Sequence, residues 1–188
     1  MITSNSNNTA AANLRLFGSV RVLIISGLFV AMSIVLGKFL QIPIGDSIRI
    51  SFENLPILMA GIFFGPFIGG AVAVCADLLG CLLKGYAINP IITLGAASIG
   101  ILSGIISMML KKKNTTLIVA LSIISAHLIG SVIIKSIGLY VYFHTPIQML
   151  ALRIPTYIGT GLLEFLIISL LLKNKAFTSQ LDKICKRQ

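Results

Sequence analysis

Residues 54–83 read NLPILMAGIFFGPFIGGAVAVCADLLGCLL, and they set the architecture expected for the whole chain. The stretch contains two apolar runs, residues 54–64 and 67–83, which Gly65-Pro66 separates. Because a Gly-Pro pair marks a tight connection, the stretch predicts a short apolar helix that turns directly into a longer one. Asp77 is the one charged residue within it.

The rest of the chain is equally apolar. Of its 188 residues, 56% are hydrophobic and 11% are charged, and the mean hydropathy is +1.01. A soluble domain usually carries about 25% charged residues, so a soluble enzyme and a disordered protein are both excluded. A spanning helix needs about 20 apolar residues, and six such helices would use about 120. We therefore expect one all-α integral membrane domain with six transmembrane helices.

Six apolar runs support this count. They cover about 22–40, 54–64, 67–83, 91–110, 116–139 and 148–172. We expect a flexible N-terminal tail (1–13), a membrane domain (14–175) and a basic cytoplasmic tail (176–188). Arg15 and Arg21 precede the first run like the start of a signal peptide. Because no small-residue cleavage site follows, the run predicts a retained first helix.

The positions of the cations behind the net charge of +10 predict how the chain is oriented in the membrane. Six helices place both termini on one side. Ten of the 15 cations fall on that side: Arg15, Arg21, Lys111, Lys112, Lys113, Lys173, Lys175, Lys183, Lys186 and Arg187. The positive-inside rule makes this side cytoplasmic, so the basic balance reports topology and implies no nucleic-acid partner.

Small residues at four-residue spacing suggest close helix contacts. Gly27 and Ala31 share one face of the first helix. Further sets are Gly65, Gly69, Ala73 and Asp77, and then Gly100 and Gly104. Small residues let helix backbones approach closely in lipid. Packing inside the bundle is the usual role, and docking onto a partner membrane protein is the alternative.

The remaining charges gather in the outer half of the bundle. Ionisable groups within spans are expensive and usually face a cavity or a partner. There, Arg49, Lys84, Lys135 and Arg153 outnumber Glu53 and Asp77, while Glu164 lies deeper. This pattern predicts a pocket that is open to the outside and suits an anionic organic solute. For each charge alone, snorkelling or a structural ion pair is the alternative.

Aromatic and polar neighbours complete the candidate site. The candidate lining is Arg49, Phe52, Glu53, Asp77, Lys84, Tyr86, Asn89, Lys135, Arg153 and Tyr157. His127, Ser131 and Lys135 are expected on one face of the fifth helix, at spacings of i, i+4 and i+8.

Several chemistries find no support in the sequence. Cys75, Cys81 and Cys185 form no Cys-x-x-Cys motif, and there is no His cluster, so we expect no metal. The phosphate loop, His-Glu-x-x-His and Gly-x-Ser-x-Gly motifs are also missing, so we expect no catalytic residue and no cofactor. The chain is short for a self-sufficient transporter, and a single-pocket binder that takes its energy from partners fits its size.

Two other classes remain as alternatives. A membrane lipid enzyme would need a cluster of acids or a His–acid pair near the headgroups, and the acids in this sequence look isolated. A channel would need polar residues through the full depth of the membrane.

Four stretches bear a resemblance to a known family. They are Gly27–Ala31, residues 49–66 (RISFENLPILMAGIFFGP), Ala76-Asp77-Leu78-Leu79-Gly80 and Arg153-Ile154-Pro155. The chain resembles, over roughly residues 20–172, the substrate-binding S-components of energy-coupling factor (ECF) transporters, most closely the folate-type family. After Gly80 it departs from the folate-type pattern, since Lys84-Gly85-Tyr86-Ala87-Ile88-Asn89-Pro90 replaces a turn rich in Pro, Gly and aromatics.

The resemblance implies a function. It implies a multi-pass protein of the bacterial plasma membrane that captures folate or a related vitamin from outside. The Gly27/Ala31 face would dock onto a transmembrane coupling protein bound to two cytosolic ATPases. ATP hydrolysis would then topple the binder, which has no ATPase activity of its own. Another vitamin or precursor, such as pantothenate, is the alternative substrate.

Folate also suits the charges. Its two carboxylates would pair with Arg and Lys. Its pterin ring would stack on aromatics and donate to Asp77 or Glu53.

Overall fold

The computed structural model describes residues 20–44, 48–110, 114–176 and 178–179 as a helical bundle with one small hairpin. In chain order the elements are α2 (Val20–Ile34), η1 (Val35–Phe39), β1 (Ile42–Ile44), β2 (Ile48–Ile50), α3 (Asn54–Phe64), α4 (Pro66–Lys84), α5 (Pro90–Met109), α6 (Thr115–Ser125), η2 (Ala126–Ile134), α7 (Lys135–Phe143), α8 (Ile147–Ala151) and α9 (Arg153–Lys173). The two η elements are π-helical. They continue α2 and α6 without a break, so η1 lengthens the first helix and η2 joins α6 to α7.

The helices match the six apolar runs. Among the described residues, five helical stretches are long and apolar enough to cross a membrane: Val20–Phe39, Pro66–Lys84, Pro90–Met109, Thr115–Phe143 and Ile147–Lys173. Asn54–Phe64 is a shorter apolar helix. Many large apolar side chains are exposed on these helices, as lipid contact requires. The predicted helical membrane bundle is confirmed at this level.

The hairpin was not predicted. β1 and β2 pair antiparallel, with Ile42 opposite Ile50 and Ile44 opposite Ile48. The sequence carried the signal, because apolar residues alternate on both sides of Gly45-Asp46, as in a β-hairpin. The expected all-α bundle therefore holds for the helices, and this short hairpin is an addition in the connection between η1 and α3.

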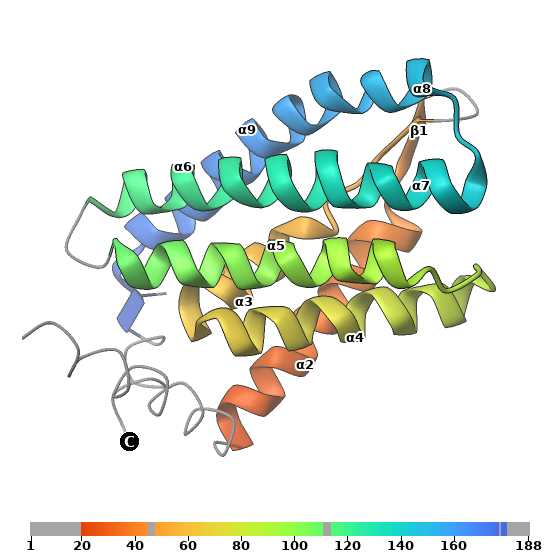
Figure 1. Ribbon diagram of the computed structural model, residues 1–188. Helices are drawn as coiled ribbons and strands as arrows, with labels where there is room; N and C mark the ends of the chain where they lie inside the picture. Colours follow the sequence, from red (N-terminus) through yellow and green to blue (C-terminus); the bar gives the residue numbers. More distant parts are fainter. Residues whose placement is uncertain (1–19, 45–47, 111–113, 177, 180–188) are drawn as a thin grey trace, which may run out of the picture.

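The long helix formed by α6, η2 and α7 runs beside α5, and α5 runs beside α4 (Figure 1). α2 packs on α3 and α4 at the bottom of the view, and α9 packs on α6 and η2 at the top. The core between these helices contains Leu58, Phe64, Ile99 and Ile168, each at most 1% exposed. The pocket described below lies at the end of the bundle that carries α7 and α8.

Glycines bring α3, α4 and α5 into backbone contact. A Cβ atom on Gly100 would lie 2.1 Å from the carbonyl oxygen of Gly69, and one on Gly104 would lie 2.3 Å from the nitrogen of Pro66. The α3–α4 turn also needs glycine, because Gly65 has φ of 90°, a region that other residues rarely adopt. Internal packing, predicted for these small residues, is confirmed.

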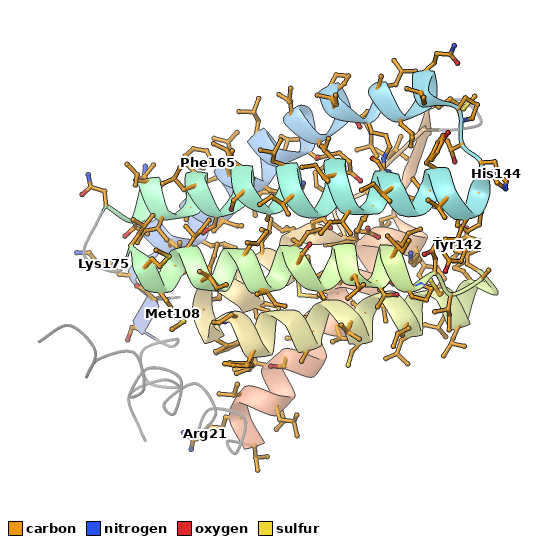
Figure 2. All side chains as sticks on the ribbon, viewed as in Figure 1. Arg21, Met108, Tyr142, His144, Phe165 and Lys175 are labelled. Atoms are coloured by element: carbon orange, nitrogen blue, oxygen red, sulfur yellow. The ribbon has the colours of Figure 1, made fainter. Side chains whose placement is uncertain are left out.

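The labelled residues show which helix ends lie at the same end of the bundle. Arg21, Met108 and Lys175 lie at one end, and Tyr142 and His144 lie at the other (Figure 2). The first helix thus begins at the end where the last helix finishes, as an even number of spans requires. The tails and the lysine run 111–113 lie outside the described residues.

Replacing Gly100 with Val should destabilise the bundle by about 1–3 kcal/mol, the usual cost of overpacking. The added side chain has no room against the α4 backbone. Thermal unfolding in detergent micelles measures the loss. Gly27→Ala is the matched control, because a Cβ atom there meets nothing within 4 Å, and it should melt at or slightly above the wild-type temperature. Equal melting of both variants would contradict the packing argument.

Candidate functional site

A pocket of about 360 Å³ opens at the α7–α8 end of the bundle. One wall comes from η1, β2 and the start of α3, and the opposite wall comes from α8 and the first turns of α9. Its lining is Gly37, Lys38, Gln41, Ile50, Ser51, Glu53, Asn54, Tyr86, Leu139, Thr145, Met149, Leu150, Arg153, Thr156, Tyr157 and Thr160. The volume is typical of small-molecule sites.

Four of the candidate residues line this pocket: Glu53, Tyr86, Arg153 and Tyr157. They come from the start of α3, the turn after α4 and the first two turns of α9. The fold therefore gathers one anion, one cation and two aromatic side chains from three separate parts of the chain.

Asp77 and Lys135 lie beneath the pocket. Both line a void of about 10 Å³, together with Lys38 and Glu53. Asp77 accepts a hydrogen bond from Thr93 Oγ1 at 2.7 Å. Lys135 is 5% exposed and donates from Nζ to Glu53 Oε1 at 2.9 Å, so it is ion-paired and does not snorkel.

The other candidates lie elsewhere. The Lys84 ammonium sits 4.4 Å from the centroid of the Phe39 ring. Asn89 is buried as the N-cap of α5, where it accepts from the Ile91 nitrogen and donates to the Gly138 carbonyl of α7. Phe52 and Asn89 are not among the lining residues, and the side chain of Arg49, on β2, lies outside the described part of the chain.

The Glu53 carboxylate is the centre of an ionic cluster. Oε1 accepts from Lys135, and Oε2 lies 3.8 Å from Lys38 Nζ. Burial alone would raise the pKa of Glu53, but the charges of Lys135 and Lys38 together outweigh it and lower this pKa to about 2. The carboxylate therefore stays ionised at neutral pH and offers the pocket a permanent acceptor.

Three glycines make room for this cluster. A Cβ atom on Gly37 would lie 2.5 Å from Glu53 Cβ, and one on Gly95 would lie 2.7 Å from Lys135 Cγ. On Gly80 it would lie 2.8 Å from Lys38 Cε. Larger residues at these positions would displace the charged side chains from their contacts in the cluster.

Arg153 and Tyr157 form a polar wall on α9. The Arg153 Nη2 donates to the Tyr157 hydroxyl, and its Nη1 donates to Ser136 Oγ at 3.3 Å. Both partners are neutral, and no carboxylate among the described residues forms an ion pair with this guanidinium. An anionic ligand group can therefore supply its counter-charge.

Twelve of the 16 lining residues were not among the sequence candidates, and two of them, Lys38 and Asn54, bring a charge and an unpaired polar group. Lys38 stands at the end of the first apolar run, and this position was the signal in the sequence that could have placed it at the site. Asn54 is 2% exposed, and its Oδ1 has no hydrogen-bond partner. An unpaired buried acceptor is costly, so it suits a ligand N–H donor.

A buried His–acid pair corrects the view that all acids are isolated. His127 Nε2 lies 2.6 Å from Glu164 Oε2, near the middle of the spans Thr115–Phe143 and Ile147–Lys173. The pairing was hidden because the two residues meet only through the packing of α9 on η2. Its depth does not match the headgroup position that a lipid enzyme needs.

The small-residue pair on the first helix faces outward. Gly27 and Ala31 are both exposed, and Gly27 lines a shallow apolar groove of about 350 Å³ between α2 and α4. This pair therefore does not serve the internal packing that the other small residues serve.

The geometry defines a membrane-embedded binding protein with a polar pocket at one end. The pocket offers cations for an anion, aromatic rings for a flat group and acceptors for N–H donors. Among the described residues, no group of His, Cys, Asp and Glu is arranged to hold a metal ion.

The family comparison agrees with this class. Residues 21–174 match the family model "ECF transporter, substrate-specific component", so the chain belongs to this family. Members of the family are the substrate-specific components of ECF transporters.

The individual relatives match this chain over a short stretch or at low sequence identity. The folate transporter FolT of Clostridium novyi (strain NT) is 38% identical over 66 residues, which are 34% of this chain and 37% of that protein. A crystal structure of FolT bound with folic acid superposes with a TM-score of 0.64 at 22% identity, over 79% of this chain and 90% of that one. The S component of a bacterial ECF transporter gives 0.60 at 21% identity, over 81% and 94%. Both structural matches support the fold.

Replacing Lys135 with Leu should lower the free energy of unfolding by about 2 kcal/mol, because it leaves the Glu53 carboxylate without its nearest cation. The loss stays below that of a fully buried pair, since Lys38 remains 3.8 Å away. Thermal or denaturant unfolding in micelles measures it.

The pH dependence of the unfolding free energy tests whether the Glu53–Lys135 ion pair causes this loss. Because the pKa of Glu53 falls from 4.5 to about 2, the pair stabilises the fold above pH 4.5 and loses this contribution as the pH falls towards 2. Lys84→Leu is the control and should cost under about 1 kcal/mol. An equal loss in both variants at neutral pH would refute the structural role of the ion pair.

Proposed function

We propose that this chain captures a folate-type vitamin from outside the cell and delivers it through an ECF complex. The observation that carries the proposal is the composition of the pocket, in which Lys38 and Arg153 face the same space as Tyr86 and Tyr157. The two carboxylates of folate would pair with the cations, which bind such groups strongly when partly desolvated. The pterin ring would stack on tyrosine, and its N–H groups would donate to Glu53 and Asn54.

The orientation follows from charge. Arg21 and Lys175 lie at the end opposite the pocket. Placing that end in the cytoplasm satisfies the positive-inside rule and turns the pocket outward. Both termini are then cytoplasmic, and the protein lies in the bacterial plasma membrane.

Energy would come from partners. The exposed Gly27/Ala31 face would dock onto the transmembrane coupling protein, which two cytosolic ATPases drive, and toppling would release the vitamin inside. Small residues on an exposed helix face allow the close approach that this docking requires. Asp77 and Lys135 then support the site through the void that they share with Lys38 and Glu53, and Asn89 caps the start of α5.

A different vitamin, such as pantothenate, is the second candidate. The turn at Lys84–Pro90 carries Tyr86 into the pocket and departs from the folate-type pattern. A smaller anion would use the same cations and fewer of the aromatic contacts.

Titration calorimetry of the purified chain tests the substrate. Folic acid should bind without any partner protein, and Arg153→Ala should weaken it by about 2–4 kcal/mol, the cost of losing a desolvated charge partner. Lys84→Ala is the matched control, since this cation lies at the same end but outside the pocket lining. Heat with pantothenate and none with folic acid would move the assignment to the second candidate.

Ala31→Trp tests the docking face. The bulky ring should prevent close helix approach and abolish vitamin uptake by cells that carry the whole complex, while folic acid binding by the purified chain stays unchanged. Ile133→Trp places the same ring on an exposed position of η2 and should leave uptake intact. Normal uptake in the Ala31 variant would rule out docking through this face.

A further inference from the structure

Tyr157 separates two cavities. Its side chain lines the polar pocket and also an apolar groove of about 500 Å³ between α6, η2 and α9. His127 also lines this groove, whose other lining residues are apolar. The position of this one ring therefore decides where the polar pocket ends.

Contacts hold the ring on both sides. On the pocket side, Arg153 donates to its hydroxyl. On the other side, the His127 ring lies 5.4 Å away between centroids, at an angle of 33°. His127 is itself fixed by Glu164 at 2.6 Å and by Ser131 Oγ at 3.3 Å. A continuous series of contacts thus runs from Glu164 through His127 and Tyr157 to Arg153.

The pair at the deep end of this series is expensive to bury. Glu164 is 0% exposed, His127 is 6% exposed, and Glu164 Oε1 has no hydrogen-bond partner. Apolar side chains of similar size would fill this place at lower cost, so the pair is better explained by the geometry that it specifies. It connects η2 to α9 at a depth where few other polar groups can fix their register.

We infer that His127 and Glu164 are positioning residues for ligand binding. They hold α9 on η2 so that Tyr157 and Arg153 face the pocket with the spacing that an anionic, ring-bearing vitamin needs. Neither residue lines the pocket, so each acts through Tyr157. The inference rests on the proposed function, because it concerns the affinity of that same site.

Calorimetry with folic acid on the full chain in detergent tests the inference through a double-mutant cycle. Glu164→Leu should weaken binding about tenfold, within the range for residues of one network. His127→Phe keeps a ring beside Tyr157 but loses the hydrogen bond, and it should weaken binding by a similar factor. The double variant should bind as well as either single variant, because one interaction has been removed in all three.

Two further variants separate positioning from general stability. Glu164→Gln keeps an acceptor for His127 and should bind folic acid like the wild type. Leu163→Ala changes an exposed side chain at the same depth of α9 and should also bind normally. The double variant replaces both partners by apolar groups, which a helix interface accommodates. Measuring its melting temperature checks that it folds.

The inference would be overturned if the effects of the two single substitutions on affinity multiplied in the double variant. It would also be overturned if Glu164→Gln bound folic acid as weakly as Glu164→Leu. Unchanged affinity in every variant would overturn it alone, with the proposed function intact. A wild-type chain that binds no folic acid would overturn the proposed function, and the inference with it.

Discussion

The ion pair between Glu53 and Lys135 connects residues 82 positions apart and closes the floor of the pocket. With Lys38 and Asp77 at the same small void, two cations and two anions meet there, and their charges compensate. Such a cluster is tolerable in a membrane protein only when its members pair with one another. Compensation at the floor leaves Arg153, whose described partners are neutral hydroxyls, as the cation with most to gain from an anionic ligand.

Glycine serves two separate purposes around this cluster. Gly69, Gly100 and Gly104 allow backbone contact among α3, α4 and α5, which replaces the hydrophobic driving force that lipid does not provide. Gly37, Gly80 and Gly95 instead leave space for Glu53, Lys38 and Lys135. The first group builds a tightly packed half of the bundle, and the second lets that half carry charge.

Much of this fold could be predicted from local sequence. The apolar runs give each span within a few residues, Gly65-Pro66 gives the α3–α4 turn, and the four-residue spacing of glycines gives the packing faces. Contacts between distant segments were harder. The shared face of His127, Ser131 and Lys135 followed from their spacing, since all three are buried. The His127–Glu164 pair instead depends on how α9 lies on η2, which no local spacing shows. Lys38 and Asn54 were missed for the same reason, because only the packed bundle shows which residues line the cavity.

The pocket lies between two halves that are held together in different ways. Its floor belongs to the glycine-packed helices, where Gly80 and Gly37 leave space for Lys38 and Glu53. Its wall belongs to α9, which packs mainly on α6 and η2 and which polar contacts tie down. A ligand in the pocket touches both, so it adds contacts across the junction between them. Because binding stabilises whichever arrangement the ligand contacts, occupancy should tighten this junction, and an empty pocket should leave α9 less firmly held.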